Sequence, residues 1–121
     1  MAEENQEALG QAMQLMMDAG DAKKAAKEAI QLARDGEQKA AAEKMATAKE
    51  TVNKAHNIQT KMLTAEAQGK KIELSLLIVH SQDHLMTAIT YVDLAEEIVR
   101  LYGQLKKWFG NRLNEKIACK I

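Results

Sequence analysis

The 121-residue sequence contains no proline, a single cysteine and very few aromatic side chains, which make up 3% of it. Without a second cysteine no intrachain disulfide can form, which fits a protein of a reducing compartment. Short strands bounded by proline and glycine turns are missing, and this argues against a β fold. The core therefore has to be built from aliphatic side chains and methionine.

Charge and hydropathy exclude two further classes of protein. The 17 basic residues balance 17 acidic ones, whereas a protein whose main partner is nucleic acid needs a clustered excess of Lys and Arg. No apolar run approaches the ~20 residues that a membrane-spanning helix requires. The acidic, polar start MAEENQEAL is unlike a secretory signal. We therefore expect one cytoplasmic domain without a nucleic-acid partner.

Two glycine-containing breaks divide the chain into three helical segments. Asp35-Gly36 and Gln68-Gly69 are turn signals, and glycine suits the left-handed residue that follows a helix end. Gly20 leaves open a further break in the first segment. Because the connections are short, we predict an all-α fold, an antiparallel up-down-up three-helix bundle. The helical segments are expected at residues 3–34, 37–68 and 72–109.

Each segment carries a stripe of apolar residues at alternating steps of three and four, which keeps them on one helix face. The third segment is apolar in nearly every other direction too, and one three-helix bundle cannot cover such a helix. We infer a homo-oligomer in which third helices pack together. The stripe of the third segment is Ile78, Ser81, Leu85, Ala88, Val92, Ala95, Val99 and Tyr102.

The one dense polar cluster in this apolar segment is His80-Ser81-Gln82-Asp83-His84. At 3.6 residues per turn, His80, Asp83, His84 and Thr87 share one face of the helix. Two imidazoles, a carboxylate and an amide are costly in an apolar environment unless they are paired or used. The cluster is therefore the candidate functional site.

From the residues alone, three interpretations of this cluster remain open. The first is a polar network that fixes the register of a non-enzymatic helical oligomerisation module. The second is a zinc site held by His80 and His84 at i, i+4, although Ser81 stands where the HExxH pattern needs glutamate. The third is nucleophilic attack by a neutral imidazole on a phosphoryl group. Since the chain has no glycine-rich nucleotide loop, the donor would be another phosphoprotein.

The stretch Val79-His80-Ser81-Gln82-Asp83-His84-Leu85-Met86-Thr87 resembles a family signature. It is similar to that of the lactose/cellobiose (N,N′-diacetylchitobiose) enzyme IIA components of the bacterial phosphoenolpyruvate-dependent sugar phosphotransferase system. The resemblance stops near Leu105. One departure is Ser81, where alanine or glycine is more usual, and its hydroxyl is expected to turn back to its own helix. Supporting pieces are Gly20-Asp21-Ala22, Ala33-Arg34-Asp35-Gly36, Ala55-His56-Asn57-Ile58-Gln59-Thr60 and Glu66-Ala67-Gln68-Gly69.

The resemblance implies a phosphotransferase component that works as a homotrimer through a phosphohistidine, with phospho-HPr as donor and the cognate IIB component as acceptor. His80 matches the phosphorylated residue, through its ε2 nitrogen. Asp83 matches a carboxylate that meets its two symmetry mates around one divalent cation per trimer, with Mg²⁺ the expected ion. Gln82 and His84 match supporting positions beside the site. The transported sugar would be a disaccharide of lactose, cellobiose or chitobiose type, and membrane contact would be indirect, through the sugar permease.

Outside the signature, His56 is interpreted as a surface or structural histidine. Met13, Met16 and Met17 fit either the core or a surface that contacts a partner, and core is the favoured interpretation. The expected organisation is a phosphocarrier domain at residues 1–109 and a C-terminal tail at residues 110–121. The tail region is basic with interleaved apolar residues and could contact an anionic surface. A frayed, solvated helix end is the favoured interpretation of it.

Overall fold

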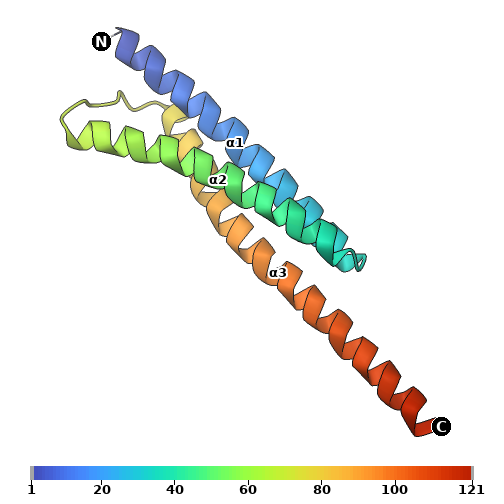
Figure 1. The fold of residues 1–121 in the computed structure, drawn as a ribbon. Helices are drawn as coiled ribbons and strands as arrows, with labels where there is room; N and C mark the ends of the chain where they lie inside the picture. The colour runs from blue at the N-terminus through green and yellow to red at the C-terminus, as the bar shows by residue number, and fades with distance from the viewer. Residues whose placement is uncertain (1, 121) are drawn as a thin grey trace.

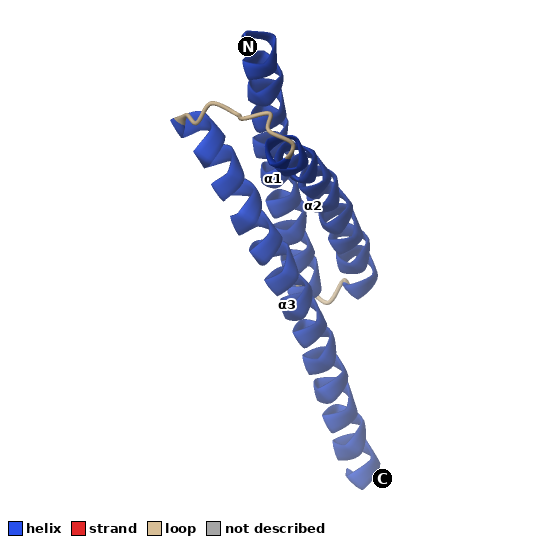
Figure 2. Ribbon diagram, turned by 90° about the vertical axis from the view of Figure 1, so that its left-hand side faces the viewer, coloured by secondary structure: helices blue, strands red, loops and turns tan. Residues whose placement is uncertain are grey.

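The computed structural model, which describes residues 2–120 and the side chains of residues 3–120, consists of three α-helices joined by two connections. The first two helices lie antiparallel, and the third runs back along them and continues beyond the turn that joins them (Figures 1 and 2). The predicted up-down-up bundle is confirmed, and the first helix is continuous through Gly20. The helices are α1 (Ala2–Arg34), α2 (Gln38–Ala67) and α3 (Leu76–Lys120).

Glycine ends both α1 and α2 as the sequence predicts. Gly36 and Gly69 have φ angles of +85° and +91°, in the left-handed region that glycine enters without a steric penalty. After α2, the Lys70 N–H donates to the Ala65 carbonyl at 3.0 Å. The same bond pattern follows α1, so carbonyls at both helix ends are satisfied by the turn itself.

The start of α3 was predicted at residue 72, and this is wrong. The helix begins after Ser75, whose hydroxyl oxygen accepts a hydrogen bond from the Ile78 N–H at 3.2 Å. A serine that accepts from the third residue of a helix is an N-cap, and it fixes where the helix begins. Ile72 instead lies in the connection, where it packs against Ala8 and Ala12 of α1.

The predicted end of α3 at residue 109 is also wrong, because the helix runs without a break to Lys120. Of the expected tail at 110–121, residues 110–120 are helical and solvent-exposed rather than frayed, and Ile121 lies outside the described residues. A single glycine, Gly110, costs a helix only about 1 kcal/mol, and no proline follows to stop it. Near the α1–α2 turn, Lys106 Nζ donates to the Gly36 carbonyl at 2.6 Å.

In α2 and α3 the core lies along the predicted stripes. The stripe predicted for α1 includes Leu9, which is 40% exposed, whereas Leu15 and Ala22 are buried there. Helix α1 packs extensively against both other helices. Alanine is the most frequent residue of the core, and small side chains let helices approach closely. Within residues 2–120, none of the helices has an apolar stretch sufficient to cross a bilayer. The buried residues of α2 and α3 are Ala41, Met45, Ala48, Val52, Ala55, Gln59, Met62, Ile78, Ser81, Leu85, Ala88, Val92, Ala95 and Val99.

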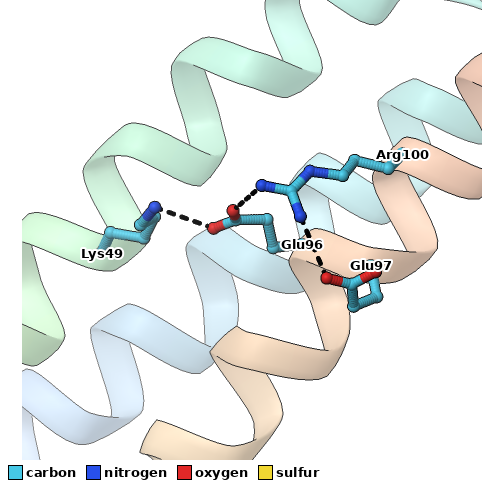
Figure 3. A network of polar contacts seen from close by, with 4 residues as sticks. All are labelled: Lys49, Glu96, Glu97 and Arg100. Carbon is cyan, nitrogen blue, oxygen red and sulfur yellow. Dashed lines mark hydrogen bonds and ion pairs between the residues drawn. The ribbon is translucent and has the colours of Figure 1, made fainter.

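An ion-pair network joins α2 to α3 near the middle of the bundle (Figure 3). Lys49 Nζ lies 2.9 Å from Glu96 Oε2, and the Arg100 guanidinium bridges Glu96 at 2.5 Å and Glu97 at 3.0 Å. The hydrogen bond from Lys49 is the main cause that lowers the pKa of the Glu96 carboxyl below 4.5, while partial burial acts in the opposite direction. The network therefore stabilises the α2–α3 contact when Glu96 is ionised.

We predict that Glu96→Gln lowers the free energy of unfolding at neutral pH by about 0.5 kcal/mol, as expected of a partly exposed ion pair. Because the folded-state pKa is depressed, the contribution of Glu96 is complete above the unfolded pKa and is lost as the pH falls through the folded one. Urea unfolding at neutral pH and at about pH 3 measures this. The variant and the wild type should differ only at neutral pH.

The matched control is Glu50→Gln, at an exposed glutamate of α2 for which the structure shows no ion pair. It should leave the stability unchanged at both pH values. A difference between wild type and Glu96→Gln that is as large in acid as at neutral pH would contradict this role of the carboxylate.

Candidate functional site

His80 lies in the second turn of α3, and its side chain is exposed at the surface of the bundle. Its neighbours on the helix, Val79 and Ser81, point outward and into the core respectively. The ring of His80 meets the ring of His84 edge to face, with centroids 4.9 Å apart and planes at 80°. A partner can therefore reach His80, while His84 restricts the orientation of its ring.

His84 is half-buried, and its Nδ1 atom is buried without a hydrogen-bond partner among the described residues. Thr87, one turn further on, donates back to the carbonyl of Asp83 at 3.0 Å. From α1, Lys23 Nζ donates to the Thr87 hydroxyl at 3.0 Å. This contact links α1 to the polar face of α3 and places the Lys23 ammonium group about one helical turn from Asp83.

Asp83 is exposed on the same helix face as His80. Among the described residues, no three His, Cys, Asp or Glu side chains are grouped so that they could hold a metal ion. The alternative zinc site at His80 and His84 therefore finds no third ligand there. A single chain supplies one Asp83 carboxylate, so a cation at this position requires carboxylates from further copies.

Gln82 faces α2, because successive residues turn by about 100° and two steps carry it to the opposite side of α3 from His80. Its Oε1 accepts a hydrogen bond of 2.8 Å from Nε2 of Gln59, which is buried in the α2 stripe. Sulfur atoms of Met62 and Met86 complete the surroundings of the two amides. The structure thus separates Gln82 from His80, and its supporting role in the site stays a prediction.

The Ser81 side chain is fully buried and its hydroxyl donates to the Ile78 carbonyl at 2.7 Å, as expected for a hydroxyl turned back to its own helix. His56 is exposed on α2.

The core interpretation of the methionines is wrong for Met13 and Met17, whose exposed fractions are 50% and 61%. They lie on α1, which runs beside α3 in the same direction (Figure 1).

The sequence matches the family model described as PTS system, Lactose/Cellobiose specific IIA subunit over residues 10–103. The chain belongs to this family. A lichenan-specific phosphotransferase enzyme IIA component of Bacillus subtilis is 41% identical over 97 residues, which cover 80% of this chain and 88% of the relative. The protein is thus a IIA component of the lactose/cellobiose type, and phosphotransfer is favoured over the two other interpretations of the polar cluster.

Solved structures support the same assignment. The crystal structure of the cellobiose-specific enzyme IIA from Bacillus anthracis is similar with a TM-score of 0.80 and 44% identity, covering 83% of this chain and 92% of that one. A solution structure of IIA(Chitobiose) in complex with HPr, from Escherichia coli, has a TM-score of 0.72 and 33% identity, with 82% and 96% covered. The match to the IIA family model ends at residue 103, although α3 continues to Lys120.

We predict that Gln82→Leu destabilises this IIA component, because it leaves the buried Gln59 amide without its partner, at a cost of about 1–2 kcal/mol. The double variant Gln59→Leu/Gln82→Leu removes both polar groups and should recover most of the loss. Urea unfolding of the wild type, the single variants and the double variant gives the coupling energy. Additive effects of the two substitutions would contradict the pairing seen in the structure.

Proposed function

We propose that this IIA component accepts a phosphoryl group on Nε2 of His80 from phospho-HPr and passes it to a cognate IIB component in the cytoplasm. The observation that carries the proposal is the exposed His80 ring, held by the family's signature stretch on a helix whose other face is anchored in the core. The structure of the similar E. coli IIA(Chitobiose) with HPr supports the choice of donor. The transported sugar would be a disaccharide of lactose, cellobiose or chitobiose type.

The transfer needs little chemistry beyond positioning. The Nε2 lone pair of neutral His80 attacks the phosphorus of the donor's phosphohistidine, and the donor's P–N bond breaks as the new P–N bond forms. One P–N bond replaces another, so no net proton, water or nucleotide is consumed. The edge-to-face contact with His84 limits rotation of the attacking ring, which favours in-line approach.

The surface around His80 suits a protein donor. Val79 on α3 and Met13 and Met17 on α1 are exposed apolar side chains on the neighbouring helix surfaces. Methionine adapts its shape to different partners, which fits a carrier that must contact a donor and then an acceptor. An apolar contact would also exclude water and slow hydrolysis of the labile P–N bond.

We further propose that the working unit is a homotrimer with the α3 helices around a threefold axis. Beyond Asp83, exposed apolar residues of α3 follow at steps that keep them nearly in line with its carboxylate. Covering this row with two other copies brings three Asp83 side chains together, and their mutual repulsion calls for a cation. Mg²⁺ fits, because it takes carboxylate oxygens as ligands. The aligned apolar residues are Leu94, Ile98, Leu101 and Leu105.

We expect His80→Gln to abolish phosphate acceptance, because the amide has no nucleophilic ring nitrogen, while the exposed position leaves the fold intact. The measurement is intact mass after incubation with phosphoenolpyruvate, enzyme I and HPr. His56→Gln is the matched control and should still gain one phosphoryl group. Gain of a phosphoryl group by His80→Gln would refute the proposed carrier residue.

For Asp83, we expect chelation of divalent cations to weaken the wild-type trimer, whereas Asp83→Asn should remain trimeric in chelator because the three charges are gone. Light scattering gives the oligomeric state, and metal analysis should find one Mg²⁺ per three wild-type chains and none in Asp83→Asn. A trimer that keeps its cation after Asp83→Asn would show that other residues bind the metal.

A further inference from the structure

The last part of α3, residues 105–120, starts at the α1–α2 turn, where Lys106 bonds the Gly36 carbonyl, and then projects beyond the turn with no helix beside it (Figures 1 and 2). We call these residues the overhang. Every side chain of the overhang is exposed, including Trp108 and Phe109, the only Trp and the only Phe of the chain. A helix of this length is marginal in water without a packed face. An exposed helix that carries large apolar residues therefore calls for a partner.

Two rows of side chains at i, i+4 spacing run next to each other along one half of the overhang. One row is apolar, and the other begins with Trp108 and is otherwise basic. The Arg112 guanidinium lies over the Trp108 ring, 5.0 Å from its centroid. The apolar row is Leu105, Phe109, Leu113 and Ile117, and the basic row is Trp108, Arg112, Lys116 and Lys120.

The opposite half of the overhang is polar and carries Lys107, Asn111, Asn114 and Glu115. Five basic residues stand against one acidic residue in the overhang, although the whole chain has a net charge of +0. The positive charge is therefore concentrated at this end of the molecule. Together with the apolar row, it fits a partner that is both anionic and able to take up apolar side chains.

A second copy of the chain fits this face poorly. The row in line with Asp83 along α3 is apolar from Leu94 through Leu105 and Trp108, and the next position in register is Arg112. Parallel helices packed along this row would bring equal positive charges together beyond Trp108, which is unfavourable. The overhang is thus suited to a surface of opposite charge rather than to its own copy.

We propose that the overhang docks on the surface of an anionic lipid bilayer. The basic side chains would contact lipid phosphates, and Trp108, Phe109 and Leu113 would enter the boundary between headgroups and acyl chains. Adjacent aromatic and basic residues on a convex helix suit a flat, fluid surface, since they need no complementary groove. This direct contact goes beyond the indirect role expected for the membrane.

Docking would involve lipid contact at only one end of α3. His80 precedes Phe109 by 29 residues, which corresponds to about 40 Å along an α-helix. A protein bound through the overhang would therefore have its lipid contact well separated along α3 from His80. The proposal does not depend on the proposed function of His80, and the two fail in separate assays.

The test is sedimentation of the full-length protein with vesicles of phosphatidylglycerol and phosphatidylcholine, and with vesicles of phosphatidylcholine alone. We expect binding to the anionic vesicles only, with loss at high salt. Trp108 is a natural reporter, because it is the only tryptophan, and its emission should shift to shorter wavelength on binding. Lys116→Gln/Lys120→Gln should weaken binding about 25-fold, at about fivefold per charge.

Leu113→Ser/Ile117→Ser should abolish the emission shift, because it removes half of the apolar row. The matched controls lie on α2: Leu63→Ser changes a leucine of similar exposure, 59% against 61% for Leu113, and Lys54→Gln/Lys61→Gln removes two exposed charges. Both controls should bind as the wild type does. Circular dichroism checks that all variants keep their helix content.

Three results would overturn the proposal. One is absence of binding to anionic vesicles at low salt, and another is equal loss of binding in the α2 controls. The third is a changed oligomeric state of the overhang variants with vesicle binding unaltered, which would make the overhang an interface between copies. If an acidic soluble protein binds the overhang and anionic vesicles do not, the first of these results applies and the proposal is overturned. Measuring phosphorylation of His80 in the same variants shows separately whether the carrier function is intact when lipid binding fails.

Discussion

The packing of one stripe of α3 against α1 and α2 fixes how α3 is rotated, and the whole site depends on that rotation. Ile78, Ser81 and Leu85 are buried on one side of the helix. Since residues on an α-helix advance by about 100° each, this places His80 and Asp83 on the outer side. A rotation by one residue would bury the imidazole and expose the core. The hydrophobic effect that folds the bundle therefore also places His80, the proposed nucleophile, at the surface.

Contacts on both flanks of α3 reinforce this rotation. On the α2 side, the buried Gln59 amide bonds Gln82, and on the α1 side Lys23 bonds Thr87. Neither contact touches His80. Their effect is to hold the helix on which it sits, so that the ring needs only the edge-to-face contact with His84 for its orientation. The candidate site is thus held mainly by backbone geometry and little by direct contacts to His80.

The sequence predicted the bundle and its buried stripes well, because apolar periodicity and the turns at Gly36 and Gly69 depend on local chemistry. The start of α3 was missed because Ile72 is apolar, whereas the Ser75 N-cap decides where the helix begins. Helical spacing alone predicted that His80 and Asp83 share one face of α3. The same helical spacing places Gln82 on the side of α3 that faces α2. The match to the family signature groups Gln82 with the site residues and does not reveal this orientation. The cation proposed at Asp83 would need carboxylates from more than one chain, so neither the sequence nor one bundle determines it.

The end of α3 was misjudged for a different physical reason. Chain termini are commonly poorly ordered, and this is why the basic end of the chain was expected to be a frayed, solvated helix end. Residues 110–120 remain helical in a chain with no proline, and the match to the IIA family model ends at residue 103. The core contacts of α3 extend to Tyr102, and the last contact of α3 with the bundle is the hydrogen bond from Lys106 to the Gly36 carbonyl. The overhang can therefore bind a surface without turning the part of α3 that carries His80, so docking would change where the carrier works and leave its chemistry unaltered.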